Sequence, residues 1–264
     1  MMTPLAYEDE ALSTENFTEA DHSSLAATGK ISSTDLLLFA EKLAVPASED
    51  MFQRPRIVEL LSRSLNQFNG TMISGRVRTG KTTAAADVAR RYGRVGWYSI
   101  EATDIDWQLF SKYFCSAVRS MLDTKTDFPM APGTVSEETI SAFLNDVLQT
   151  DKTSADPRLL VLDDIHHVFD APWFSDLFKH LLFSVGADIH LLFTCRSKPP
   201  LPLWRLRSKQ LLNVIDEKVL VFDASETEAF LRARGHRSAL AKAAQKHSFG
   251  RIGKIVDYVA ASAD

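Results

Sequence analysis

The chain has 264 residues and a mass of 29.4 kDa, with 45% hydrophobic and 24% charged residues, the composition of a folded protein with a sizeable core. Its net charge of −4 excludes broad, charge-driven coating of nucleic acid, although it leaves a local basic patch open. The two cysteines, Cys115 and Cys195, exclude a disulfide scaffold and a Cys-rich zinc site, so we expect a cytoplasmic location.

Residues 1–32 are predicted to form a disordered acidic tail. Its acidic residues face only Lys30 as a fixed positive charge, and Ser, Thr and Ala fill most of the remainder. Such a segment buries too little apolar surface to offset the entropy lost on ordering. The alternative that the sequence leaves open is an acidic docking segment.

The rest of the chain alternates predicted helices and strands, which is typical of a parallel sheet covered on both faces. Helices are expected from Pro55, over 81–91, from Asp104, from Ser136 and over 173–183. Strands are expected at 71–74, 95–100, 159–162, 189–194 and 218–222. The predicted fold class is therefore α/β, with an α/β domain over 33–222 and a small helical lid domain over 223–264. A capping-box pattern at Ser225 and Glu228 opens the lid.

The strongest motif is GRVRTGKTT, residues 75–83, which fits the phosphate-binding loop G-x-x-x-x-G-K-[ST] between a predicted strand and a predicted helix. Its glycines permit the turn, and the helix adds its positive N-terminal end. We predict that Lys81 reaches the β- and γ-phosphates and that Thr82 ligates Mg²⁺. The predicted nucleotide-binding residues of the loop are Gly75, Arg76, Val77, Arg78, Thr79, Gly80, Lys81, Thr82 and Thr83.

Two further strands are predicted to end in catalytic side chains. The apolar run 159–162 leads into Asp163, a predicted Mg²⁺ partner, and Asp164, placed to orient or deprotonate an attacking water. Helix capping or loop hydrogen bonding is the alternative for Asp164. Arg196 follows the strand 189–194 and is predicted to sense the γ-phosphate, with a surface ion pair as its alternative. The predicted catalytic set is Lys81, Asp164 and Arg196, and the metal set is Thr82 and Asp163.

In the order of its motifs the sequence resembles the ATPase core of the MalT-type, LuxR-family regulators, which are STAND P-loop NTPases. The resemblance covers roughly residues 52–255. The residues that carry the resemblance are 75–83, 97–101 with Asp104, 160–166, 194–197, 199–202 and 204–207. It implies a parallel five-stranded sheet between helices, with an extra strand between the phosphate-loop strand and the acidic strand. It also implies a helical lid over the nucleotide, and it places Arg54 near the nucleotide.

The resemblance further implies a switch that rests with ADP, is active with ATP and hydrolyses slowly. Such regulators usually continue into a helical-repeat sensor and a DNA-binding helix-turn-helix, and this chain ends where those would begin. We therefore expect a protein partner to supply the sensor or output function. The lid element of the family contains a Gly-x-Pro-like sequence, whereas the matching stretch here, residues 249–253, has no proline.

The leading hypothesis is a Mg²⁺-dependent ATP-binding switch ATPase with slow turnover, acting through a partner in signalling or transcription regulation. Its ligands would be ATP or ADP with Mg²⁺, and the sequence leaves GTP, homo-oligomer formation and nucleic acid open; no membrane partner is expected. The alternative is an oligomeric AAA-like ATPase working as a motor or loader in DNA transactions. In that case Arg76, Arg78, Arg90 and Arg91 would serve neighbouring subunits or nucleic acid. A third hypothesis is a non-catalytic module that holds nucleotide for stability.

Overall fold

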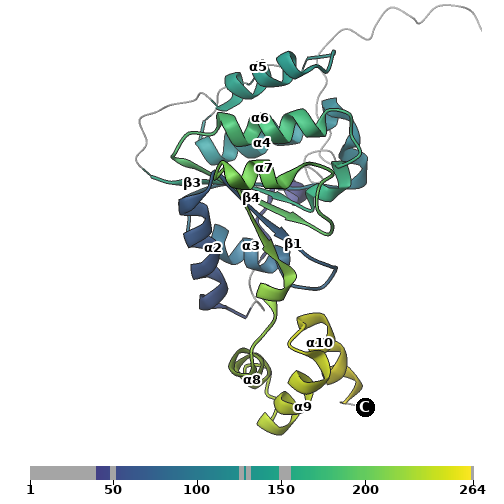
Figure 1. Cartoon of the computed structure of the whole chain (residues 1–264). Helices are drawn as coiled ribbons and strands as arrows, with labels where there is room; N and C mark the ends of the chain where they lie inside the picture. The colour runs from purple at the N-terminus through teal and green to yellow at the C-terminus, as the bar shows by residue number, and fades with distance from the viewer. Residues whose placement is uncertain (1–39, 48–51, 125–127, 129–131, 149–155, 263–264) are drawn as a thin grey trace, which may run out of the picture.

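The computed structural model describes residues 40–47, 52–124, 128, 132–148 and 156–262. The predicted acidic tail over 1–32 lies outside the described residues. Five parallel strands form one sheet in the order β2-β3-β4-β1-β5 (Figure 1). They are β1 (Gly70–Ser74), β2 (Arg94–Ser99), β3 (Arg158–Asp163), β4 (Ile189–Cys195) and β5 (Leu212–Asp216). The predicted α/β fold is thereby confirmed, and β4 is the extra strand between β1 and β3.

Helices cover both faces of this sheet. One face is packed by α2 (Pro55–Gln67) and α3 (Lys81–Ala89), and the other by α4 (Trp107–Leu122), α6 (Phe174–Ser184) and α7 (Leu203–Ser208). Helix α5 (Glu137–Leu148) packs on the outer side of α6 and α4 (Figure 1). Pro55 at the first position favours the start of α2, and the Asp106 side chain caps α4 by accepting from the Leu109 amide at 2.8 Å.

Strand β3 shows how the two layers share the sheet. Every residue of it is buried. Leu159 and Val161 point into the core shared with α2 and α3, whereas Leu160 and Leu162 point into the core shared with α4 to α6. Successive side chains of β3 thus pack against helices on opposite faces of the sheet, and both sets are buried. This explains the continuous apolar run in the sequence.

The fifth strand differs from the prediction, because residues 218–222 do not form one. The fifth strand is β5, which pairs with β1 at the edge of the sheet in the register Gly70↔Leu212 to Ser74↔Asp216. After β5 the chain turns into a 3₁₀ helix, η3 (Glu217–Leu220), which begins where the Asp216 side chain accepts from the Lys218 amide at 3.1 Å. This cap and the outward turn of Glu217 toward Arg76 end the ladder, although the β-branched residues that follow have high strand propensity.

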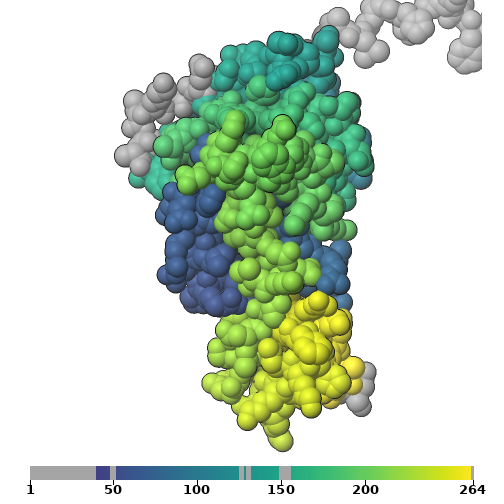
Figure 2. All heavy atoms as spheres, viewed as in Figure 1, coloured from purple at the N-terminus to yellow at the C-terminus, as the bar shows by residue number. Residues whose placement is uncertain are grey.

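Three helices follow: α8 (Ala224–Arg232), α9 (Ser238–Ser248) and α10 (Ile252–Ala261). Asp223 and Glu226, not Ser225 and Glu228, form the capping box of α8. The helices share a small core that also takes in Phe52, from the segment before α2. They form one end of the molecule, drawn yellow-green to yellow in Figure 2. We refer to residues 223–262 as the lid; its status as a separate domain stays a prediction.

Among the described residues, no helix is long and apolar enough to cross a membrane.

Candidate functional site

The loop between β1 and α3 has the backbone that phosphate binding requires. Gly80 has φ +86°, a conformation that glycine adopts without strain. Helix α3 begins at the next residue, with no capping side chain and no acidic residue in its first turn, so its N-terminal amides have no anionic side chain beside them. At Gly75 an added Cβ would lie 2.5 Å from Cβ of Glu217, which packs against the loop, so this contact also excludes a side chain at that position.

Lys81 is folded over this loop. Its side chain is buried, and its Nζ donates to the carbonyl oxygen of Arg76 at 2.9 Å. Burial lowers the pKa of Lys81, because the ammonium group has lost much of its water. Because this hydrogen bond goes to a neutral carbonyl, a phosphate group would give the ammonium group a charged acceptor in direct contact.

The predicted metal residues lie side by side. The Thr82 hydroxyl is 3.1 Å from each carboxylate oxygen of Asp163, and the Thr194 hydroxyl donates to Asp163 Oδ1 at 2.5 Å. Burial raises the pKa of Asp163, with the hydrogen bond from Thr194 opposing it. A hydroxyl and a carboxylate are hard oxygen donors, which fits Mg²⁺. In the described ranges, no three His, Cys, Asp or Glu side chains gather to hold a metal by themselves.

Asp164 has the left-handed backbone conformation, with φ 55°, directly after β3. Its amide donates to the Thr194 hydroxyl at 2.8 Å. Its carboxylate lies between two cationic or titratable groups, 3.6 Å from Nδ1 of His166 and 3.6 Å from a guanidinium nitrogen of Arg196. Although Asp164 occupies the N-cap position of a 3₁₀ helix, its side chain makes no capping hydrogen bond there. The alternative interpretation of Asp164 as a cap therefore finds no support.

Arg54 lies at the pocket but is held by the lid. It donates to Glu226 Oε2 at 2.8 Å and to the Leu220 carbonyl at 2.7 Å, and its guanidinium stacks 3.9 Å from the centre of the Phe222 ring. The family resemblance placed it near the nucleotide. In the structure it borders the site while joining α2 to the lid.

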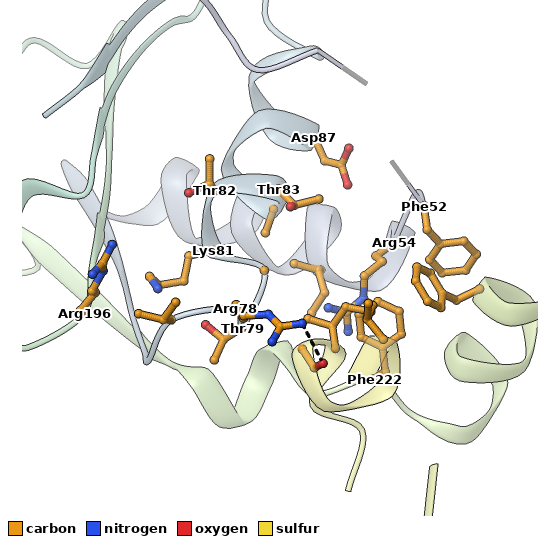
Figure 3. Close-up of a pocket in the computed structure, with 18 of the residues that line it drawn as sticks. Phe52, Arg54, Arg78, Thr79, Lys81, Thr82, Thr83, Asp87, Arg196 and Phe222 are labelled. Atoms are coloured by element: carbon orange, nitrogen blue, oxygen red, sulfur yellow. Dashed lines mark hydrogen bonds between the residues drawn. The ribbon is translucent and has the colours of Figure 1, made fainter. Parts of the chain in front are cut away.

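One cavity of about 530 Å³ is lined by Arg54, Lys81, Thr82, Asp164 and Arg196. Figure 3 shows Lys81, Thr82 and Arg196 toward one end and Phe52, Arg54 and Phe222 toward the other. The far end has an aromatic wall in which the Phe52 ring meets Phe222 at 6.0 Å and Phe230 at 5.7 Å between centroids. Arg78, Thr79, Gly80 and Thr83 also line the cavity, as does Val77, whose side chain is exposed.

Sequence reasoning missed Thr194 as a site residue and missed the aromatic wall. Thr194 could have been found from its position at the end of β4, next to Arg196. No local signal marks the wall, because Phe52, Phe222 and Phe230 come from distant segments.

A phosphate loop after the first strand, an acidic pair after β3 and a helical lid over one pocket define a P-loop NTPase domain. Residues 67–197 match the family described as AAA domain. The chain is 28% identical over 184 residues to the HTH-type transcriptional regulator MalT of Vibrio cholerae and 26% identical over 186 residues to that of Vibrio parahaemolyticus, each match covering 69% of this chain. These matches support the predicted MalT-type ATPase core, within which residues 67–197 resemble an AAA domain. The chain spans 20% of the length of these curated relatives.

Two solved structures share the fold. One is a STAND protein with a tetratricopeptide-repeat sensor from Pyrococcus horikoshii, with a TM-score of 0.50 and 15% identity over 80% of this chain and 30% of that chain. The other is a Walker-type ATPase of Pyrococcus abyssi, with a TM-score of 0.54 and 14% identity over 84% of this chain and 70% of that chain.

Proposed function

We propose that the protein is a Mg²⁺-dependent ATP-binding switch with slow hydrolysis, which acts through a protein partner in signalling or transcription regulation in the cytoplasm. One observation carries the nucleotide part: the phosphate loop, Asp164 and Arg196 meet at one end of a cavity whose other end is aromatic. A triphosphate needs amides and cations, and a purine base stacks on aromatic rings. The cavity has the amides and cations at one end and the aromatic rings at the other.

The roles follow from the contacts. The first-turn amides of α3 and the Lys81 ammonium would hold the β- and γ-phosphates, and Arg196 would meet the γ-phosphate at the sheet edge. Thr82 and Asp163 would hold Mg²⁺, which would neutralise charge on the phosphates. Asp164, held between Arg196 and His166, would orient the water that attacks the γ-phosphate.

The relation to MalT supports the regulatory part of the proposal, since the names of those relatives describe transcriptional regulators. The alternative of a DNA motor receives less support. Three of the four arginines that it would use form ion pairs within the chain: Arg76 with Glu217 at 2.8 Å, Arg78 with Asp257 at 2.6 Å and Arg90 with Asp87 at 2.8 Å.

Calorimetric titration with ATP, ADP and GTP, each with and without Mg²⁺, tests the nucleotide site directly. We expect Mg²⁺ to strengthen ATP binding in the wild type. Lys81→Ala removes a charge-assisted contact of about 1.5–3 kcal/mol, so ATP affinity should fall by at least about tenfold. Lys209→Ala, at a lysine outside the cavity lining, is the matched control and should bind like the wild type. Unchanged ATP binding in Lys81→Ala would mean that the site is misassigned.

Turnover measurements separate the switch from the motor. A slow rate that is independent of protein concentration and of added DNA is expected for the switch. A rate that rises with both would favour the motor.

A further inference from the structure

Asp87 is a carboxylate in the cavity that none of the nucleotide-binding motifs accounts for. It lies in α3, is only 9% exposed and lines the same cavity as Lys81 and Phe52. Its Oδ1 accepts from Arg90 at 2.8 Å, and the charge of Arg54 also acts on it. Burial raises the pKa of Asp87, with the charge of Arg90 opposing it. The fold thus keeps an acidic group in a pocket that is otherwise built for a polyanion.

Its place along the helix tells which part of a nucleotide it can reach. Thr83 and Asp87 are four residues apart, so they lie on the same face of α3, about 6 Å apart along the axis. Thr83 belongs to the phosphate loop, and Phe52 to the aromatic wall. Figure 3 shows Asp87 beyond Thr83, away from Lys81 and on the side of Phe52. It therefore lies between the phosphate end and the base end of the cavity.

A carboxylate only accepts hydrogen bonds, so its ligand must present donors. The phosphates of a nucleotide present none and would repel it. The ribose between phosphate and base presents two hydroxyl groups, and hydrogen bonds to a charged acceptor are stronger than those between neutral groups. Sugar hydroxyls are therefore the donors whose position in a nucleotide matches the position of Asp87 in the cavity.

Resting on the proposed nucleotide site, we propose that Asp87 is the residue that binds the ribose hydroxyls and makes the pocket selective for ribonucleotides. Its interaction with Arg90 leaves the carboxylate in the cavity lining and holds it in place from the side of α3. Arg54, engaged by the lid, adds a nearby positive charge that helps keep the buried carboxylate ionised.

The test compares the affinities of ATP, 2′,3′-dideoxyATP and inosine triphosphate, which lacks the 6-amino group, by calorimetry. The wild type should bind ATP at least about tenfold more tightly than the dideoxy analogue. Asp87→Ala should bind the two equally, and Asp87→Asn, which keeps a neutral acceptor, should show an intermediate ratio. The ratio between ATP and inosine triphosphate should be the same in all three proteins.

Asp176→Ala is the matched control, because it removes a helix carboxylate that pairs with Lys179 outside the cavity lining. It should retain the preference for ATP over the dideoxy analogue, and thermal unfolding should verify that each variant is folded. The inference is overturned if Asp87→Ala still discriminates against the dideoxy analogue, or if it changes the inosine ratio instead. Failure of the wild type to bind any of the three would instead refute the nucleotide site itself.

Discussion

The Thr194 hydroxyl connects the two carboxylates of the candidate site. It donates to Asp163 and accepts from the amide of Asp164, and it is fully buried at the end of β4. The same hydroxyl therefore donates to Asp163, the proposed Mg²⁺ residue, and accepts from the backbone of Asp164, the proposed water-orienting residue. The Thr194 hydroxyl therefore fixes the end of β3 relative to the end of β4.

Replacing Thr194 by valine keeps the shape and removes these bonds. Each buried polar group left without its partner costs about 1–3 kcal/mol, so ATP turnover with Mg²⁺ should fall at least about tenfold. ATP binding without Mg²⁺ should change little, since Thr194 does not line the cavity. The control is Thr71→Val, a buried hydroxyl on β1 that pairs with Ser64 at 2.6 Å. Wild-type turnover in Thr194→Val would contradict the coupling.

Asp163 gives a prediction about pH. Burial raises the pKa of its carboxyl in the folded, nucleotide-free protein above the ordinary value of 3.8. The ionised form therefore destabilises the fold, and this penalty grows as the pH rises through the raised pKa. Asp163→Asn should consequently unfold at a higher temperature than the wild type at neutral pH, and the difference should shrink as the pH falls toward 3.8. Mg²⁺ should no longer strengthen ATP binding in the variant. A lower melting temperature at neutral pH would contradict the prediction.

The sequence carries a motif for the phosphate end of the candidate site and none for the aromatic end, for a physical reason. Gly80 and Lys81 form one turn whose backbone demands are local, so they leave a motif. The aromatic wall is assembled by tertiary packing of Phe52 with Phe222 and Phe230, and single phenylalanines in three segments are indistinguishable from ordinary core residues. The role of each predicted site residue stays a prediction.

At the scale of elements, α10 lies directly against the phosphate loop. The Gly253 amide donates to the Arg78 carbonyl at 3.1 Å, and an added Cβ at Gly253 would lie 2.9 Å from Arg78 Cβ and 3.0 Å from its carbonyl oxygen. The Arg78 guanidinium also pairs with Asp257, one turn further along α10. The loop that would bind phosphate is thus in contact with the lid on its outer side.

Gly253→Val should separate α10 from the loop. Crowding of this kind costs about 1–3 kcal/mol, and we expect a comparable loss of ATP affinity, because the loop must shift or the lid must open. Calorimetry and thermal unfolding measure the two effects. Gly93→Val is the matched control, since a Cβ at Gly93 meets nothing within 4 Å. If both variants bind ATP equally well, contact between the lid and the loop does not affect binding.

The misplaced fifth strand shows a limit of element prediction. Residues 212–216 and 218–222 are both rich in strand-forming residues, and propensity alone does not choose between them. The choice depends on which segment reaches β1, and that depends on the short helix α7 and the cap at Asp216. The strands that begin and end at strong local signals, β1 and β3, agree with the sequence analysis to within a residue.

For the molecule as a whole, alternating strands and helices predicted the layers, but the position of the lid depends on contacts that the sequence cannot reveal. Arg54 and Glu226 are 172 residues apart and form a hydrogen-bonded ion pair between the start of α2 and α8. Arg56 joins the same carboxylate at 3.0 Å. We call these three residues the lid clamp. Together with Phe52, which packs among the lid residues, the clamp fixes the lid beside the cavity.

The lid clamp should make the closed molecule sensitive to acid. Burial alone would raise the pKa of Glu226, but the hydrogen bonds from Arg54 and Arg56 outweigh it, and the pKa lies below the ordinary value of 4.5. A carboxyl whose pKa is lower in the folded than in the unfolded state stabilises the fold when the pH is above the unfolded-state pKa. That contribution is lost as the pH falls through the folded-state pKa. The lid should therefore loosen below about pH 4.5.

Glu226→Gln should loosen the lid at neutral pH, because it removes the carboxylate that is hydrogen-bonded to the buried Arg54 guanidinium, at a cost of about 1.5–3 kcal/mol. Hydrogen exchange should rise in α8 to α10 while the sheet stays protected, and ATP should restore protection if the nucleotide bridges core and lid. Glu59→Gln breaks an exposed pair with Arg63 and should change exchange little. If the sheet loses protection to the same extent, the core and the lid unfold as one unit. The lid clamp would then stabilise the entire molecule and would not control access of the nucleotide to the cavity.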